Sequence, residues 1–208
     1  MNIGRNKLNL ESIGVIVEHA EGAVLDSKLY FNKIQSLILE QVLKLSLVVD
    51  IIHECILRKN SIWIMGNGGS ASTAEHFETD LHFIKHGEKI RIGAQSLTSN
   101  SSLITAIGND IGFEEVFRHQ LMRKSKKKDL VILISASGNS QNLINAAMFA
   151  KENDLETIAL LGFDGGKLLD LVDHHILIKS EIGMYGPVED IHLAICHAIA
   201  SELLDKLK

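Results

Sequence analysis

The sequence contains few aromatic, proline and cysteine residues. Aromatics make up 5% of the 208 residues, so aliphatic side chains must fill most of the core. Proline occurs once, as Pro187, and cysteine only as Cys55 and Cys196. Both cysteines lie inside helical patterns and do not suggest the disulfide framework of a small secreted protein. This cysteine usage indicates a cytoplasmic protein.

Long apolar runs and an excess of basic charge are also missing. No stretch reaches the roughly 18 uninterrupted apolar residues that cross a bilayer, and residues 1–7 do not lead into the apolar region of a signal peptide. The net charge of −5 argues against nucleic acid as the main partner. The basic run at 123–128 has no interleaved aromatics, so we interpret it as a solvated helix end, with a polyanion patch as the alternative. We expect neither a nucleic-acid nor a membrane partner.

Hydrophobic periodicity predicts helices at 8–24 and 27–58, followed by alternating strands and helices. The longer helix must cover its apolar face either on the sheet domain or against other subunits. Short apolar strands separated by helices predict an α/β fold with a five-stranded parallel sheet covered on both faces. The expected strands are 61–65, 91–96, 129–134, 156–162 and 174–179. The expected helices after residue 60 are 70–83, 99–108, 112–123, 140–153, 165–171 and 188–206.

Two loops rich in glycine and serine follow apolar strands. Residues 66–70 read Gly-Asn-Gly-Gly-Ser, and residues 135–140 read Ser-Ala-Ser-Gly-Asn-Ser. Backbone N–H groups and hydroxyls at the start of a helix bind phosphate well. Neither loop has the P-loop or dinucleotide-binding spacing, so the pair predicts a phosphorylated small molecule. The alternative is two tight turns in which Ser70 and Ser140 cap helices.

With these loops, the chain resembles the SIS (sugar isomerase) family, and within it the phosphoheptose isomerases. The resemblance implies a three-layer αβα sandwich, a phosphorylated sugar as substrate, and a homotetramer with active sites between subunits. It divides the chain into an N-terminal helical arm for oligomer packing (1–59) and a SIS domain (60–208). The matching segments are 66–71, 76–77, 108–113, 135–140, 165–167 and 189–197.

The resemblance also implies site residues. The substrate is expected to bind Asn67, Gly68, Gly69, Ser70, Ser135, Ser137, Asn139 and Ser140, with Asp110 near the sugar. His76, Asp80, Glu189 and His197 stand where several phosphoheptose isomerases bind a metal, typically zinc. His197 is expected to act as an acid–base group or metal ligand, and Asp80 or Glu189 as the base. Three positions depart from the family: Asp80 replaces a catalytic Glu, Glu189 replaces a Gln, and Gly186 replaces an Asp.

The spacing of the candidate ligands fits this interpretation. His76 and Asp80 lie four residues apart and share one helix face, so with His197 they form a set that zinc accepts. Alternatively, His76 is a structural residue of its helix and Asp80 lies on an exposed face. His192 and Cys196 are also four apart, and we interpret them as core or interface residues rather than a second metal pair.

The expected activity is ketose–aldose isomerisation of a heptose phosphate through an enediol, for heptose or surface-polysaccharide biosynthesis. This chemistry requires a base that reaches a C–H bond and a group that stabilises the developing oxyanion. Two alternatives remain open at this point. One is a SIS protein that binds phosphosugar without turnover and organises a partner. The other is an isomerase that acts on a different sugar phosphate.

Overall fold

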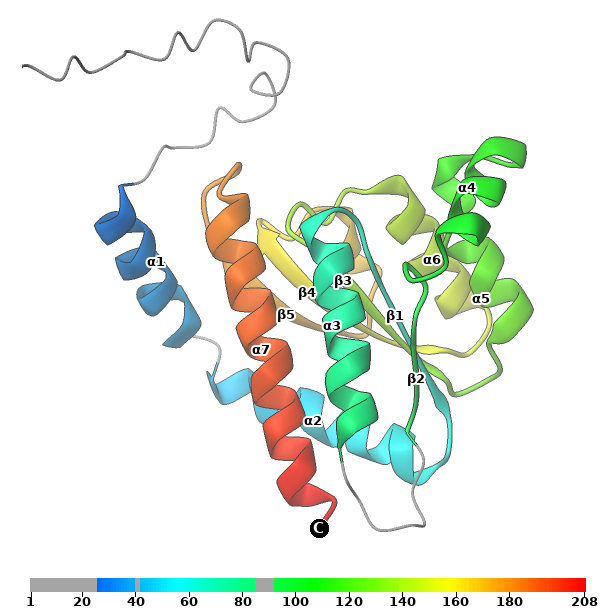
Figure 1. The fold of residues 1–208 in the computed structure, drawn as a ribbon, viewed down its shortest axis with the longest axis horizontal. Coiled ribbons are helices and arrows are strands. Elements are labelled where there is room, and N and C mark those ends of the chain that lie inside the picture. Colours follow the sequence, from blue (N-terminus) through cyan, green and yellow to red (C-terminus); the bar gives the residue numbers. More distant parts are fainter. Residues whose placement is uncertain (1–25, 40–41, 85–91) are drawn as a thin grey trace, which may run out of the picture.

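The computed structural model describes residues 26–39, 42–84 and 92–208. Five strands form one sheet in the order β2-β1-β3-β4-β5, and every neighbouring pair is parallel (Figure 1). The predicted five-stranded parallel sheet is therefore confirmed. The strands are β1 (Ser61–Gly66), β2 (Gly93–Ser96), β3 (Leu130–Ser135), β4 (Glu156–Phe163) and β5 (His174–Lys179).

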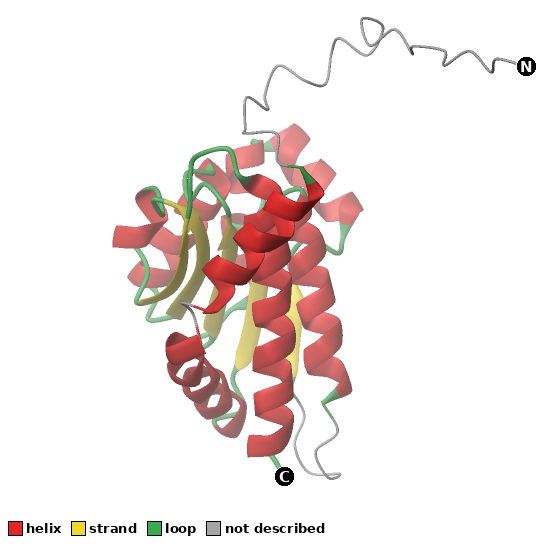
Figure 2. Ribbon diagram, turned by 90° about the vertical axis from the view of Figure 1, so that its left-hand side faces the viewer, coloured by secondary structure: helices red, strands yellow, loops and turns green. Residues whose placement is uncertain are grey.

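Helices cover both faces of this sheet, which makes the expected three-layer sandwich (Figure 2). Three helices pack with one face, and three pack with the other. The first set is α2 (Val42–Leu57), α3 (Gly69–Phe83) and α7 (Tyr185–Lys206), with α1 (Ser27–Leu39) lying against α7. The second set is α4 (Ser101–Asp110), α5 (Arg118–Lys124) and α6 (Gln141–Glu152). Two short 3₁₀ helices, η2 (Phe113–Glu115) and η3 (Lys167–Asp170), join the second layer. Within the described ranges, no helix is long and apolar enough to span a membrane.

The strand sequences explain the two cores. Ile62 and Ile64 of β1 belong to the cluster under α2, α3 and α7, whereas Trp63 and Met65 belong to the opposite cluster. Successive strand side chains point to opposite faces, so a strand between two helical layers must be apolar at nearly every position. This is why a continuous apolar run, rather than an alternating pattern, marked each central strand.

The prediction of a single helix at 27–58 was wrong, because the structure has two helices, α1 and α2, in this range. A straight helix over this range would be about 48 Å long, too long to bury its apolar positions on one small domain. Helix α2 packs into the core through Val48, Val49 and Ile52. The Tyr30 hydroxyl of α1 donates a hydrogen bond of 2.6 Å to Asp190 of α7. The helix expected at 8–24 lies outside the described residues, and the use of residues 1–59 in oligomer packing stays a prediction.

Two other expected helices are shorter than predicted. The segment 112–123 splits into η2 and α5, and 165–171 contains only the 3₁₀ turn η3. Gly165 and Gly166 both have positive φ, +88° and +52°, which α-helical backbone does not allow. Helix α7 begins at Tyr185, earlier than the expected start at 188, and Pro187 lies in its first turn, where a proline is tolerated.

His192 is a core residue, as the sequence interpretation held. It is fully buried on α7, and its Nε2 lies 3.2 Å from the carbonyl oxygen of Leu161 on β4. Burial disfavours the charged imidazolium and lowers the pKa of His192 to about 4, although the hydrogen bond to Leu161 partly opposes this. Folded protein therefore keeps this ring neutral well below the ordinary pKa of histidine.

This lowered pKa predicts acid-sensitive stability. Between the ordinary pKa of histidine, near 6.5, and about 4, the unfolded chain binds a proton that the folded chain does not. The free energy of unfolding should therefore fall as the pH drops through this window, by up to about 1.4 kcal/mol per pH unit. Urea denaturation at pH 7 and pH 5 measures this change in the free energy of unfolding. A His192→Gln variant should show a flatter pH dependence, and equal slopes for the two proteins would contradict the assignment.

Candidate functional site

The two glycine- and serine-rich loops lie side by side at the carboxyl edge of the sheet. They follow β1 and β3, which are hydrogen-bonded neighbours with Gly66 opposite Ile134. In the strand order 2-1-3-4-5, the chain reverses its winding direction between β1 and β3. Open parallel sheets bind their ligands in the crevice at such a reversal. The two loops thus lie where a sheet of this topology ordinarily binds its ligand.

The helices that follow these loops begin without side-chain caps. Helix α3 has Gly68 at its N-cap, which has no side chain to accept a hydrogen bond. Helix α6 has Ser140, whose side chain accepts none from its helix. Helix α4 differs, because its N-cap Asn100 accepts a bond of 2.9 Å from the backbone N–H of Leu103. Side-chain capping, the alternative explanation for Ser70 and Ser140, is therefore not observed. The N–H groups of Ser70, Ala71 and Leu143 bond to backbone carbonyls at these helix starts. An anionic ligand would use the helix dipoles and the remaining first-turn N–H groups.

Serine hydroxyls and one asparagine shape the second loop. Ser135 Oγ accepts a bond of 3.0 Å from the N–H of Gly138, and Ser137 Oγ accepts one of 3.3 Å from the N–H of Asn139. Each hydroxyl keeps its own hydrogen to donate to a ligand oxygen. The Asn139 amide donates to the carbonyl of Ser137 at 3.0 Å and accepts from the N–H of Lys167 at 3.1 Å. The Asn139 side chain thus fastens the loop to η3.

Replacing Gly138 by alanine should disrupt this loop. Gly138 has φ +63°, and an added Cβ would lie 1.9 Å from the carbonyl oxygen of Gly165. We expect a loss of about 2 kcal/mol or more in the free energy of unfolding, together with weaker phosphate binding. Urea denaturation and calorimetric titration with phosphate measure these effects. Gly108→Ala is the control, because its Cβ would meet only Phe113, at 4.0 Å, and a helical alanine should not destabilise. Equal behaviour of the two variants would contradict the prediction.

A cavity of about 430 Å³ opens between the two loops and η2. Of the predicted substrate-binding residues, Asn67 and Ser140 line it. Ser70 is buried in the first turn of α3, Gly69 is exposed as the first residue of this helix, and Gly68 is exposed at its N-cap. Asp110 is exposed at the end of α4, shortly before the η2 residues that border the cavity. The lining residues are Asn67, Phe113, Glu114, Ser140, Gln141 and Asn142.

Sequence reasoning missed four of the lining residues, namely Phe113, Glu114, Gln141 and Asn142. Phe113 and Glu114 belong to a segment that was expected to be plain helix. Asn142 carried one usable signal: it is a polar residue at a buried position of an amphipathic helix, and buried amides need hydrogen-bond partners. Its partner is Asn67 in the first loop.

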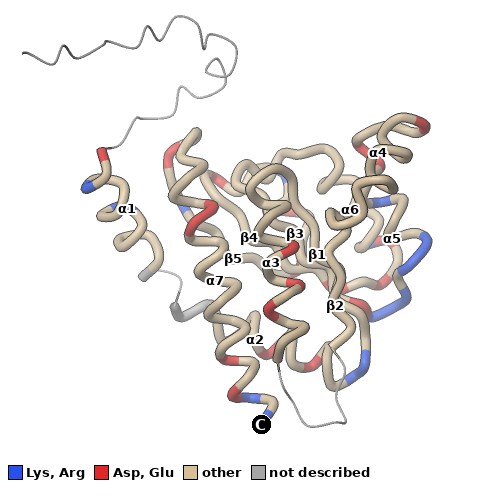
Figure 3. The backbone as a smooth tube through the Cα atoms, in the orientation of Figure 1, with Lys and Arg blue, Asp and Glu red and all other residues tan. Residues whose placement is uncertain are grey.

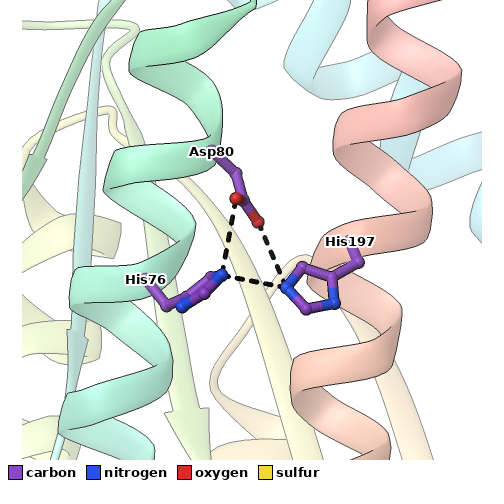
Figure 4. Close-up of side chains that lie close together, drawn as sticks. All are labelled: His76, Asp80 and His197. Carbon is purple, nitrogen blue, oxygen red and sulfur yellow. Dashed lines mark hydrogen bonds and ion pairs between the residues drawn. The ribbon is translucent and has the colours of Figure 1, made fainter.

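A second group of functional side chains lies between α3 and α7. His76 and Asp80 of α3 face His197 of α7 (Figure 4). His197 Nε2 lies 2.9 Å from His76 Nε2 and 3.7 Å from Asp80 Oδ2, and His76 Nε2 lies 3.5 Å from Asp80 Oδ1. Both imidazoles are about half exposed, whereas Asp80 is mostly covered. The predicted association of these three residues across the fold is present.

This group fits a divalent metal ion. Four ligands at the 2.0–2.1 Å typical of zinc–nitrogen and zinc–oxygen bonds lie about 3.3 Å from one another in a tetrahedron. The three separations, 2.9, 3.5 and 3.7 Å, scatter around that value. Asp80 Oδ2 is also buried without a hydrogen-bond partner in the structure. A buried carboxylate oxygen without a donor is what a cation at this point would satisfy.

Glu189 does not join this group. Its carboxylate instead lies against the first loop, where a Cβ added to Gly69 would be 2.3 Å from Glu189 Oε2. Burial and the neighbouring charge of Asp190 raise the pKa of Glu189 above its ordinary value. Of the four residues that the resemblance assigns to a metal, the structure thus brings three together. The fourth residue, Glu189, is half-buried, and its carboxyl group lies beside the start of α3.

Comparisons with known proteins agree with this architecture. The family model for the SIS domain matches residues 30–162. A phosphoheptose isomerase from Neisseria meningitidis is 36% identical over 151 residues, covering 72% of this chain and 77% of its own. One from Geobacter sulfurreducens is 36% identical over 157 residues, covering 76% and 82%. The solved phosphoheptose isomerase of Neisseria gonorrhoeae superposes with a TM-score of 0.75 at 31% identity, covering 85% and 93%. The chain therefore belongs to the SIS domain family and is a relative of the phosphoheptose isomerases.

Proposed function

We propose that this protein is a phosphoheptose isomerase, a cytoplasmic enzyme that interconverts sedoheptulose 7-phosphate and D-glycero-D-manno-heptose 7-phosphate for heptose and surface-polysaccharide biosynthesis. One observation carries the proposal beyond family membership. Helix α3 begins at the first phosphate-type loop and, further along, presents His76 and Asp80 to His197. A single helix thus joins a site for the phosphate to a group of side chains that can exchange protons.

The chemistry assigns separate roles to these parts. The two loops hold the phosphate through backbone N–H groups and through the hydroxyls of Ser70, Ser135, Ser137 and Ser140. A carboxylate removes the proton from C1 of the ketose and returns it to C2, while an acid–base group moves the hydroxyl proton between the two oxygens. Asp80 is the first candidate for the base and His197 for the second role. Glu189, at the first loop, is the other candidate base.

The same group is the proposed position of one zinc ion per subunit. His76, Asp80 and His197 would hold it, because their donor atoms have the separations and the unpartnered oxygen described above. A bound zinc ion would stabilise negative charge that develops on the substrate oxygens. The histidines must be neutral to act as ligands, so metal affinity should fall at acidic pH.

A homotetramer with active sites between subunits is part of this proposal. The imidazoles of His76 and His197 are exposed beside an apolar border, in which Phe83 is 70% exposed and Leu204 39%. A cavity of about 280 Å³ lies there, open to solvent in the single chain. Burial of such a border against a second subunit would exclude water from the proton-transfer group. This supports a site that a neighbouring subunit completes.

The direct test is incubation of the purified protein with sedoheptulose 7-phosphate, with and without added zinc. An aldose heptose 7-phosphate product is expected, and an Asp80→Asn variant should lack most of this activity. The absence of product in both conditions would reject the proposed reaction. A panel of other phosphorylated ketoses, assayed in parallel, separates this reaction from isomerisation of a different sugar phosphate.

Asp80 itself favours one alternative function, a phosphosugar-binding protein that organises a partner without turnover. Aspartate is one methylene shorter than the glutamate usual at this position, so with an unchanged backbone its carboxylate stops about 1–1.5 Å short. Such a displacement can reduce the rate about a hundredfold. Tight binding of sedoheptulose 7-phosphate without conversion would support this alternative.

A further inference from the structure

Two asparagine side chains join the loops across the candidate site. Asn67 Nδ2 donates to Asn142 Oδ1, and Asn142 Nδ2 donates to Asn67 Oδ1, both at 2.9 Å. Asn67 belongs to the loop after β1, and Asn142 lies in the first turn of α6, directly after the loop that follows β3. Both residues also line the cavity of about 430 Å³. The amide pair therefore bridges the two segments that would hold the phosphate.

The two partners differ in how firmly the fold holds them. Asn142 is only 2% exposed, and its neighbours Leu143 and Ile144 are buried in the core beneath α6. Asn67 is half-buried in a loop between two glycines. A buried amide on a packed helix has little freedom, whereas a glycine-flanked loop residue has much more. Asn142 is thus the fixed member of the pair, and Asn67 is the member that it holds.

The pairing also decides which atoms of Asn67 can face a ligand. An amide has two N–H donors and an oxygen with two acceptor positions. The bonds to Asn142 use one donor and one acceptor position and fix which end of the amide is nitrogen. One N–H and one acceptor position remain at the cavity. This set suits a phosphate oxygen together with a sugar hydroxyl.

We propose that Asn142 is a positioning residue for the substrate: it holds Asn67, and with it the first loop, at the separation from the second loop that a phosphorylated sugar requires. The proposal rests on the proposed function in one respect, the phosphosugar nature of the ligand. Asn142 acts through Asn67 rather than by touching the reacting carbons. Its loss should therefore weaken binding much more than it slows the chemical step.

The test is a double-mutant cycle on binding. Dissociation constants for inorganic phosphate and for sedoheptulose 7-phosphate are measured calorimetrically for the wild type, Asn67→Ala, Asn142→Ala and the double variant. Asn142→Ala should weaken binding about tenfold, because it breaks the two hydrogen bonds of the pair. Asn67→Ala should weaken binding at least as much, because it also removes the groups of Asn67 that face the ligand. The double variant should bind like Asn67→Ala alone, without a further loss of about tenfold, because Asn142 acts only through Asn67 and coupled residues are not additive. KM should rise with the dissociation constant while kcat changes less than about threefold.

Asn153→Ala is the matched control. Asn153 lies at the other end of α6, where its amide donates to the carbonyl of Phe149 at 2.8 Å. This variant should bind both ligands like the wild type. Should Asn142→Ala fail to fold by circular dichroism, Asn142→Ser takes its place in the cycle, since serine fills more of the space and keeps a hydrogen-bonding group.

The outcomes separate the positioning role from the proposed function. If the wild type binds neither phosphate nor phosphosugar, the proposed function itself fails. If the wild type binds but the losses of the two single variants multiply, or the Asn142 variant binds like Asn153→Ala, the positioning role is rejected. A fall in kcat with unchanged KM would also reject it, because it would place Asn142 in the chemical step.

Discussion

Replacing His197 by alanine is expected to lower kcat/KM for sedoheptulose 7-phosphate by about a thousandfold, the middle of the range for a general acid–base group. His197 is the member of the group that comes from α7, so its loss removes both an acid–base group and a candidate metal ligand at once. The imidazole is about half exposed and supports little packing. The folded state and the phosphate loops should therefore survive the change.

The measurement compares steady-state kinetics with calorimetric binding of inorganic phosphate. Phosphate should bind the His197→Ala variant as it binds the wild type, because the loops lie at the start of α3 and α6. His82→Ala is the control, since His82 is an exposed histidine near the end of the same helix, α3, that carries His76. A loss below about tenfold, or a parallel loss of phosphate binding, would show that His197 has another role.

Replacing Asp129 by alanine is expected to lower the free energy of unfolding by about 3–5 kcal/mol. The Asp129 side chain is fully buried at the amino edge of the sheet, just before β3. Its carboxylate accepts hydrogen bonds of 2.9–3.1 Å from four groups. Alanine would take the acceptor from all four, and only Asn60 Nδ2 would keep another partner, the carbonyl of Lys127. The donors are Asn60 Nδ2, the N–H of Ser61, Trp63 Nε1 and the N–H of Lys126.

Urea denaturation at neutral pH measures this loss. Asp154→Asn is the control, because it removes only an exposed ion pair with Lys127, and asparagine tolerates the left-handed backbone of this position (φ +55°). It should leave the unfolding midpoint nearly unchanged. Asp129→Asn should fall between the wild type and Asp129→Ala, since one oxygen remains to accept. An unfolding midpoint for Asp129→Ala equal to that of Asp154→Asn would contradict the structural role of the carboxylate.

Much of the fold follows from local patterns. The strand from Ser61 and the strand from Leu130 were recognisable because both faces of a central parallel strand are buried, which requires apolar residues throughout. The position of the two loops followed from the same pattern, since parallel strands bring their carboxyl ends to one edge. The pairing of His76 with Asp80 followed from helical spacing alone.

Other features depend on contacts between distant segments. The division into α1 and α2 has no glycine or proline to mark it in the sequence. Both helices pack against α7 and β5, and only the folded chain brings these elements together. The position of Glu189 against Gly69 depends on how α7 crosses α3. The Asn67–Asn142 pair joins residues 75 positions apart. Periodicity in one segment carries no information about such pairings.

The charged residues are also unevenly distributed (Figure 3). Basic residues from the end of α5 to the start of β3 form the run 123–128, within which Lys127 pairs with Asp154. This run lies toward the amino ends of the strands, at the opposite edge of the sheet from the two loops. Among the described residues, this basic run therefore lies away from the loops that we propose to hold the phosphate.

Helix α7 is a single rod of 22 residues that carries Glu189 near its start and His197 two turns later, about 12 Å along its axis. Because α7 is one continuous helix, a movement along its axis displaces both of these residues together. If α7 moved along its axis and carried Glu189 away from Gly69, the His197 imidazole between α3 and α7 would move by the same distance. In the proposed function, phosphate binding and proton transfer are therefore coupled through α7, and a shift of this helix would change both.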